Sequence, residues 1–249
     1  ICHHEQLPQL GRTENHLLYK DPKRKIGSQS ETPRIQFQDD NIIVSGYQHF
    51  VINKQTRHIE YISKQSKFNY ISTLMKNLNT NYNCTSLVDI GCNAGLSSLI
   101  ALNNNFEDIV SLDHDPEYIH TLTTIKQACD INKINEYVYS FGDTISKKFD
   151  VVFCGALIHW VFSLTAEFRN FISIMSYLNS LTNKFLVIEW VHPDDRAIRA
   201  LNHIKKRGKK TDEEYNTQNF EIAIKKFTNI ISKKNTYCST RTIYVLEKL

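Results

Sequence analysis

Two glycines, Gly91 and Gly95, lie four residues apart directly after a short apolar run. Residues 86–90 have the composition of a buried strand, and residues 96–102 have the pattern of a helix. A glycine at a strand end lets the backbone turn sharply, and a second one lets a ligand or the strand come close to the helix start. The N–H groups at that helix start can then face a ligand. An ordinary strand–turn–helix connection fits the same pattern.

The loop differs from the dinucleotide-binding fingerprint G-x-G-x-x-G in two respects. Asn93 replaces one glycine, and Asp89 adds a carboxylate just before the turn. A carboxylate there favours a cationic ligand or bridges donors of the loop, and it is a poor neighbour for a pyrophosphate. These differences disfavour a nicotinamide-dependent dehydrogenase, which would share the strand, the glycine turn and the helix.

Two further carboxylates follow the next strands of the chain. Asp113 ends the second strand, 22 residues after Gly91, close to the spacing of ~20 expected for a carboxylate that accepts hydrogen bonds from ribose hydroxyls. Asp143 follows the third strand. Each aspartate taken alone also fits a helix cap or a turn.

Short apolar strands alternate with amphipathic helices over most of the chain. The pattern predicts strands at 86–90, 109–112, 137–139, 149–154 and 185–191, and helices starting at Ser66 and Asp115, over 168–178, after Pro193 and over 220–231. A hairpin is expected at 236–239 and 242–246. Strands that are apolar on both faces favour a parallel sheet covered on both sides.

We therefore expect an α/β fold, doubly wound, with a mostly parallel seven-stranded sheet and a C-terminal antiparallel hairpin. This domain covers residues 66–249. Four β-rich pieces within residues 34–65 predict a small N-terminal β meander, and residues 1–33 read as an irregular arm.

The motifs in this order resemble those of the class I S-adenosylmethionine-dependent methyltransferases. The resemblance covers residues 66–249 and rests on four segments: 88–95, 111–117, 141–143 and 149–159. It implies the cofactor S-adenosyl-L-methionine, with the glycine loop around its methionine part, Asp113 at the ribose, Asp143 near the adenine amine and the fourth strand beside the methyl group. The implied cofactor-binding residues are Asp89, Gly91, Cys92, Asn93, Gly95, Asp113, His114, Asp143, Cys154 and Gly155.

Methyl transfer is a direct displacement, so positioning and exclusion of water supply most of the catalysis. A base is needed only where the acceptor must lose a proton. His159, just past the fourth strand, is the candidate catalytic base. The alternative is a histidine packed against Trp160 and Phe162. Glu189, Trp190 and His192 form a second cluster at the end of the fifth strand, where open α/β sheets bind ligands.

Residues 188–195 and 239–244 resemble bacterial-type methyltransferases associated with saccharide or other small-molecule tailoring, and this resemblance implies methyl transfer to an oxygen of a small molecule or glycan. RNA is the alternative acceptor, because residues 205–210 are a basic run, although such a run also suits a solvated helix end. A non-catalytic cofactor-binding subunit is the other alternative. No metal is expected, since Cys2, His3 and His4 have no partner cluster.

Composition sets the broad class of the protein. The chain has 249 residues and a formal net charge of +4, which is too mild to demand nucleic acid. It has no run of eighteen apolar residues, so no membrane span is expected. None of its six cysteines forms a C-x-x-C pair. Free thiols indicate a reducing compartment, and we expect a cytoplasmic protein.

Overall fold

The computed structural model of the chain describes residues 33–165, 167–200 and 214–249. Its first strands are β1 (Arg34–Gln38), β2 (Asn41–Ser45), β3 (Phe50–Asn53) and β4 (Ile59–Tyr61), which form a four-stranded antiparallel sheet in the order β1-β2-β3-β4. This sheet confirms the expected meander. The expected arm, apart from residue 33, lies outside the described residues.

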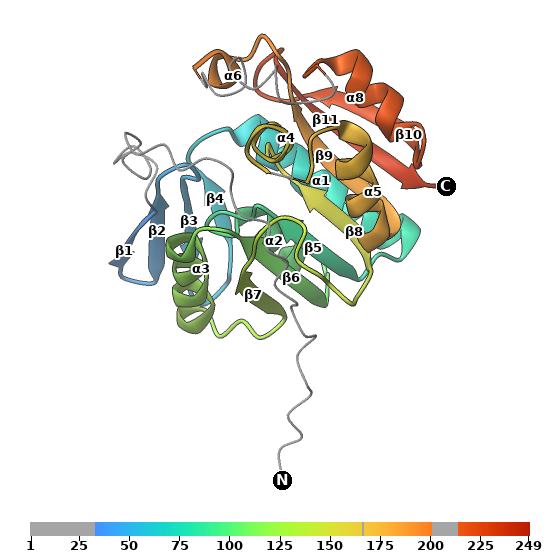
Figure 1. The fold of residues 1–249 in the computed structure, drawn as a ribbon. Helices are drawn as coiled ribbons and strands as arrows, with labels where there is room; N and C mark the ends of the chain where they lie inside the picture. Colours follow the sequence, from blue (N-terminus) through green and yellow to red (C-terminus); the bar gives the residue numbers. More distant parts are fainter. Residues whose placement is uncertain (1–32, 166, 201–213) are drawn as a thin grey trace.

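A seven-stranded sheet forms the centre of the molecule (Figure 1). Its strands are β5 (Ser86–Ile90), β6 (Asp108–Asp113), β7 (Ile134–Val138), β8 (Phe149–Cys154), β9 (Thr182–Val191), β10 (Thr228–Asn235) and β11 (Arg241–Lys248), in the order β10-β11-β9-β8-β5-β6-β7. The strands from β7 to β9 are parallel, whereas β11 is antiparallel to both β9 and β10. The predicted fold class is therefore confirmed.

Helices cover both faces of the large sheet. The helices are α1 (Gln65–Tyr82), α2 (Leu96–Asn103), α3 (Pro116–Ala128), α4 (Ile158–Leu164), α5 (Phe171–Leu181), α6 (Arg196–Ala200) and α8 (Thr217–Ile224). Buried side chains of α1, α2 and α3 form one apolar core together with those of the small sheet. Side chains of α4, α5 and α8 form a second core on the opposite face. The small sheet is thus an integral part of one core.

The start of α1 differs from the prediction, which made Ser66 the helix cap. The N-cap is Lys64, which has φ 54° and ψ 37°, in the left-handed region. The Lys64 carbonyl accepts hydrogen bonds from the N–H groups of Lys67 and Phe68, at 3.0 and 3.2 Å. Because the chain is already helical at Gln65, Ser66 lies inside the first turn and cannot cap it.

The C-terminal region also differs from the prediction. The helix expected over 220–231 ends at Ile224, and β10 begins at Thr228, so the hairpin starts eight residues before its expected first strand. In this strand Ile230 packs against the core while Ile231 is 49% exposed. Alternation of this kind, in a segment with β-branched residues, favours a strand. The helical spacing of apolar residues therefore does not extend beyond Ile224, and from Thr228 the spacing is that of a strand.

Smaller differences concern three element boundaries. The third strand covers Ile134–Val138, not 137–139, because its pairing with β6 begins at Ile134 opposite Ile109. The helix expected from residue 168 begins at Phe171, since Asn170 accepts a hydrogen bond from the Ser173 N–H at 2.8 Å and caps it. The helix expected after Pro193 begins at Arg196, and its expected end before Gly208 lies outside the described residues.

Candidate active site

The order of the strands places a reversal of direction beside β5. From β5 the chain adds β6 and β7 on one side, and then β8 and β9 on the other. In open α/β sheets the crevice at the carboxyl ends of the strands flanking such a reversal binds ligands. The loop 91–95 leaves β5 at this edge, and the predicted residues Cys154 and Gly155 leave β8 there. The topology therefore brings the predicted cofactor loop and the fourth-strand motif together.

Left-handed backbone conformations shape the loop. Gly91 and Gly95 have φ values of 78° and 81°, and Asn93, which replaces a glycine of the dinucleotide fingerprint, has φ 54°. Asparagine is one of the few residues with a side chain that tolerates this region, which explains why the substitution keeps the turn.

The N–H groups of the loop are bonded within the protein. Those of Gly91 and Cys92 donate to the Leu112 carbonyl at 2.8 and 3.0 Å, and that of Gly95 donates to the Cys92 carbonyl at 2.9 Å. The Asn93 N–H donates to Asp113 Oδ2 at 2.8 Å. These N–H groups precede α2, which begins at Leu96, and they fix the shape of the turn, whereas the expectation that N–H groups at the helix start face a ligand stays a prediction.

Gln48, in the connection between β2 and β3, completes the loop and was missed by the sequence analysis. Its Oε1 accepts a hydrogen bond from the Leu96 N–H at 3.1 Å, and its Nε2 donates to the Cys92 carbonyl at 3.1 Å. The side chain is buried. The small N-terminal sheet thus supplies the cap of α2 and holds the loop from outside the large sheet.

Gly95 is required for packing between helices. A Cβ atom at Gly95 would lie 2.5 Å from Cδ1 of Leu122 in α3. The space that we expected to admit a ligand or the strand is therefore occupied by the Leu122 side chain. A Cβ at Gly91 would lie 3.2 Å from Cδ2 of Leu157, which follows β8, so this glycine faces the neighbouring strand end.

Asp89 lies beneath the loop and not on its surface. It is 1% exposed, and its Oδ2 accepts a hydrogen bond from Ser98 Oγ of α2 at 2.8 Å, while the Ser111 hydroxyl bonds Ser98 Oγ at 2.7 Å. Burial raises the pKa of Asp89 to about 7, against the lowering effect of the Ser98 hydrogen bond. The sequence predicts that this carboxylate binds a cationic ligand or accepts hydrogen bonds from the loop. Its hydrogen-bond donor in the structure, Ser98, belongs to α2 and not to the loop. Direct contact with a cofactor stays a prediction.

Asp113 ends β6 and faces the glycine loop. Besides Asn93, it accepts a hydrogen bond from the Asp115 N–H at 3.1 Å, through Oδ1. His114 Nδ1 lies 3.2 Å from the same oxygen, with the imidazole largely exposed. Each carboxylate oxygen has lone pairs left for a ligand hydroxyl. The position of Asp113 is compatible with the predicted hydrogen bonds to the ribose, and this role stays a prediction.

Asp143 closes the loop that follows β7. Its Oδ2 accepts a hydrogen bond from the Ser140 N–H at 2.9 Å, and its carbonyl accepts one from the Tyr177 hydroxyl at 2.8 Å. Tyr177 also shares a short hydroxyl–hydroxyl hydrogen bond with Tyr139. The predicted acidic residue is therefore held in place by a helix of the opposite face, α5.

The end of β8 carries Cys154 and Gly155, and α4 follows with His159. Cys154 is fully buried, and burial raises the pKa of its thiol, which disfavours the thiolate. His159 lies in the first turn of α4, is 3% exposed, and its ring centroid is 5.3 Å from that of Trp160. The sequence analysis did not expect this short helix. The catalytic role of His159 stays a prediction.

The expected cluster at the end of β9 divides between two faces of the sheet. Trp190 is buried between Phe220 and Tyr215, with ring centroids at 4.3 and 4.7 Å, whereas Glu189 points to the opposite face because neighbouring strand residues alternate. His192 is partly exposed beside Asp194. Only Glu189 of this cluster therefore lies toward Gly155.

Glu189 forms a buried ion pair with Lys67 of α1. Lys67 Nζ lies 2.5 Å from Glu189 Oε2, and both side chains are shielded from solvent. Burial opposes the charge of Lys67, but the Glu189 carboxylate and the Tyr47 phenol together outweigh burial and raise the pKa of the lysine. Glu189 Oε1 is buried with no hydrogen-bond partner among the described residues. Oε2 is 4.0 Å from where a Gly155 Cβ would lie, which places the pair at the end of β8.

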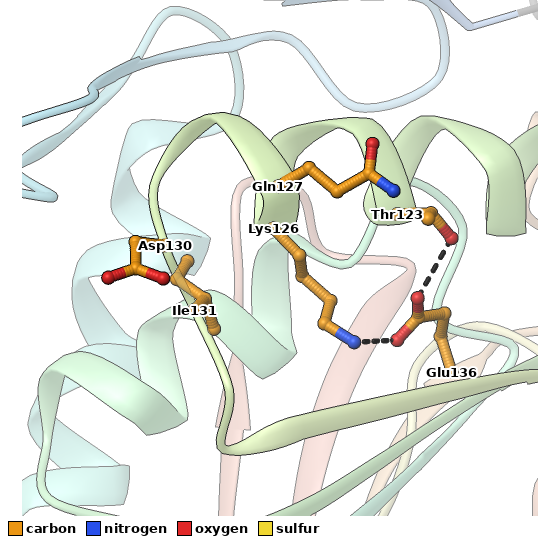
Figure 2. Close-up of a pocket in the computed structure, with 6 residues that line it drawn as sticks. All are labelled: Thr123, Lys126, Gln127, Asp130, Ile131 and Glu136. Carbon is orange, nitrogen blue, oxygen red and sulfur yellow. Dashed lines mark hydrogen bonds and ion pairs between the residues drawn. The ribbon is translucent and has the colours of Figure 1, made fainter.

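A surface hollow lies elsewhere, between α3 and β7 (Figure 2). Lys126 and Thr123 both bond Glu136 there, the latter at 2.8 Å. Its polar groups satisfy one another, and it adjoins the start of β7, away from the carboxyl ends of the strands. It has no feature of an active site.

The described residues contain no group of three or more His, Cys, Asp or Glu side chains that could hold a metal ion. Within the same residues, no helix is long and apolar enough to cross a membrane. Their five cysteines are free thiols. The candidate half-site at Cys2, His3 and His4 and the basic run 205–210 lie outside the described residues.

Comparisons with known proteins agree with this geometry. A model of the ribosomal protein L11 methyltransferase (PrmA) family matches residues 40–179. A comparison with curated proteins found no significant match.

Solved structures of methyltransferases share the fold. Magnesium protoporphyrin IX methyltransferase (ChlM) from Synechocystis PCC 6803, with bound SAH, has 15% sequence identity and a TM-score of 0.52 over 74% of this chain and 83% of its own. The N-methyltransferase NodS from Bradyrhizobium japonicum WM9, in complex with S-adenosyl-L-homocysteine (SAH), has 10% identity and a TM-score of 0.54 over 72% and 86%. The ribosomal protein L11 methylase from Lactobacillus delbrueckii subsp. bulgaricus has 13% identity and a TM-score of 0.50 over 74% and 78%.

These findings agree on the cofactor, S-adenosyl-L-methionine, because neighbours of this fold are crystallised with it or with SAH. The family match covers more than half of the chain and includes the glycine loop, Asp113, Asp143 and the end of β8. The chain therefore belongs to the ribosomal protein L11 methyltransferase (PrmA) family of class I S-adenosyl-L-methionine-dependent methyltransferases.

Proposed function

We propose that this methyltransferase transfers a methyl group to an oxygen of a small molecule or glycan held at the carboxyl ends of β8 and β9. The observation that supports this acceptor is the buried, unpartnered Oε1 of Glu189. A buried carboxylate oxygen without a donor is costly, and a hydroxyl group of an acceptor would supply that donor.

The residues at the neighbouring edge fit the cofactor. Asp113 and Asp143 are carboxylates with little exposure at the ends of consecutive strands, and they suit the ribose hydroxyls and the adenine amine. Gly91 follows the last residue of β5 and has no side chain to fill the space at this end of the strand. When bound, S-adenosyl-L-methionine supplies an activated methyl group with a good leaving group.

The chain's own residues then have to orient the acceptor and receive its proton. A hydroxyl loses its proton as it becomes a methyl ether, so a base accelerates the transfer. In this proposal Glu189 Oε1 orients the hydroxyl, supported by the ion pair with Lys67 that holds the carboxylate. His159, at the start of α4, is the proposed base. The burial of both side chains excludes water from the proton transfer.

A protein amine is the second candidate acceptor. The PrmA family match favours it, because the name of that family refers to a ribosomal protein. A carboxylate such as Glu189 can also hold an amine. RNA and a non-catalytic role remain the less favoured alternatives. A cytoplasmic location belongs to this proposal and is supported by the five free thiols.

Transfer of a radiolabelled methyl group tests the proposal. The protein is incubated with labelled S-adenosylmethionine and with separate fractions of host metabolites, glycans, RNA and ribosomal proteins, and the Asp113→Ala variant, for which weaker cofactor binding is expected, serves as the comparison. Label in the metabolite or glycan fraction, stable to acid as expected for an ether, supports the proposal. Label confined to proteins would establish the second candidate, and no label in any fraction would leave the non-catalytic role.

A further inference from the structure

Three cations, Lys64, Lys67 and Arg241, and the carboxylate of Glu189 lie close enough to influence one another. Two tyrosine rings flank Lys64: Tyr47 comes from the connection between β2 and β3, and Tyr237 from the loop between β10 and β11. We propose that Lys64, flanked by Tyr47 and Tyr237, binds an anionic group, a carboxylate or a phosphate, on the methyl acceptor. This inference rests on the proposed function, because it concerns the acceptor of the same site.

The other cations of the cluster already have carboxylate partners. Lys67 pairs with Glu189. Arg241 of β11 donates to both oxygens of Asp195, through Nε at 2.7 Å and an Nη at 3.0 Å. Each of these two ion pairs has no net charge. Lys64 has no ion-pair partner in the part of the chain that the structure describes, so the cluster keeps one positive charge that a ligand can neutralise.

The surroundings of Lys64 make an anion favourable. Burial, and then the charges of Lys67 and Arg241, lower the pKa of Lys64 to about 8, although Glu189 acts in the opposite direction. The Cys238 thiol and the phenols of Tyr47 and Tyr237 are the other titratable groups nearby. An anion bound to the ammonium group would offset both its burial and the repulsion from the two cations.

The two tyrosines leave access to Lys64 from solvent. The ammonium nitrogen lies 4.0 Å from the ring centroid of Tyr47 and 5.7 Å from that of Tyr237. Both rings are partly exposed, at 38% and 39%. Contact with a ring face holds the ammonium group without consuming its hydrogen bonds. The lysine is thus oriented by its neighbours and still has donors for a ligand.

Glu189 Oε1 provides the second half of the recognition. It is a buried acceptor that lacks a donor, and it influences the same lysine electrostatically. A ligand that satisfies both groups has a hydroxyl or amine for Glu189 and an anionic group for Lys64. Hydroxy acids and phosphorylated alcohols belong to this chemical class, whereas neutral sugars and unmodified alcohols do not.

Competition between small anions and chemical labelling tests the inference directly. The protein, saturated with SAH, is treated with trace acetic anhydride near pH 8, and acetylation of each lysine is followed by mass spectrometry. Inorganic phosphate and acetate are the probes, with sodium chloride at equal ionic strength as reference. A subsite with a dissociation constant of about 10 mM gives about sixfold protection of Lys64 at about 50 mM probe.

Lys234 is the matched control within the same protein. Its ammonium nitrogen lies 4.6 Å from the ring centroid of Tyr70, so it has a similar ring contact. It is an exposed residue, outside the cluster of Lys67 and Arg241. Protection of Lys64 by phosphate or acetate without protection of Lys234 supports the subsite, and the better of the two probes identifies the anion. Equal rates for Lys64 in all three salts would overturn the inference.

A charge-removing variant gives an independent readout. Lys64→Asn keeps a residue that tolerates φ 54°, so the fold is retained while the charge is lost. Calorimetric binding of the better probe is expected to fall at least about tenfold in this variant and to stay unchanged in Lys234→Asn. Unchanged binding in Lys64→Asn would also refute the subsite. SAH binding in both variants is measured separately, so failure of the subsite is distinguished from failure of the methyltransferase site.

Discussion

Replacing the buried carboxylate Asp89 with asparagine is expected to stabilise the protein at neutral pH. The ordinary pKa of this carboxyl group is 3.8, and burial raises it to about 7 in the folded protein. Between these pH values ionisation of the carboxyl group lowers the free energy of the unfolded chain, whereas the folded chain keeps the proton. Stability is therefore lost as the pH rises from about 4 to about 7, and an amide, which cannot ionise, avoids this loss.

The size of the effect follows from the pKa difference. At 1.36 kcal/mol for each pKa unit, the change from 3.8 to about 7 corresponds to about 4 kcal/mol. In the Asp89→Asn variant, the side-chain amide oxygen would still accept the Ser98 hydroxyl that now bonds Asp89 at 2.8 Å. Any cost of the new NH2 group is the same at each pH, so the difference between two pH values isolates the ionisation.

Urea denaturation of Asp89→Asn and the parent at about pH 4 and about pH 8 measures this difference. The variant is expected to gain about 4 kcal/mol relative to the parent between the two pH values. Asp150→Asn is a control of opposite sign. Burial raises its pKa, but hydrogen bonds from Thr85 and Ser86 and the charge of Lys184 together outweigh burial and lower it. Its stabilising effect is present above pH 3.8, and therefore at both pH values, and it is lost only as the pH falls further through the lowered pKa, so this variant is expected to lose similar stability at about pH 4 and about pH 8. An Asp89→Asn effect that is equal at both pH values would refute the reasoning.

Substitutions at three further positions test the loop and the site. Gly95→Ala, with φ 81° and a Cβ 2.5 Å from a Leu122 methyl carbon, is expected to lose about 2 kcal/mol or more in urea denaturation, and an unchanged midpoint would show that α3 can shift at little cost. Asp113→Ala is expected to weaken SAH binding by roughly ten- to hundredfold in calorimetry, since charge-assisted hydrogen bonds are lost; unchanged affinity would limit Asp113 to fastening the loop. His159→Ala and His159→Gln are expected to lower turnover by roughly 10²–10⁴-fold at constant SAH affinity if the residue is the base, whereas near-parental turnover with a lower melting temperature would make it a packing residue.

Local signals were sufficient to predict much of the fold. The alternation of strands and helices gave the sheet, and Asp115 followed by Pro116 gave the start of α3, where Asp115 accepts a hydrogen bond from the Glu117 N–H at 2.9 Å. The start of α1 could not be predicted, because Lys64 adopts a left-handed conformation that its residue type does not favour. At the start of β10 the apolar run is short, and so few apolar positions do not distinguish the three-to-four-residue spacing of a helix from the two-residue spacing of a strand.

The site was predictable only where its residues lie within one motif. The glycine loop and the aspartates after β6 and β7 are brought to one edge of the sheet, as the order of motifs indicated. Gln48 contacts Cys92 across 44 positions, and Lys67 reaches Glu189 across 122. No periodicity or spacing encodes contacts at such separations. They depend on the packing of the small sheet and α1 against the large sheet, which only tertiary structure reveals.

The order of strands in the large sheet has a consequence for synthesis on the ribosome. β11 is made after β10, yet it lies between β10 and β9. While translation proceeds from β10 to β11, the β9 edge has no neighbour, and β10 has no strand to join. An exposed apolar strand edge invites pairing with other nascent chains. Because Arg241, at the start of β11, also binds Asp195, this buried ion pair can form only after the strand has emerged. The strands from β5 to β9, with the glycine loop, can therefore come together before the β9 edge of the sheet is covered.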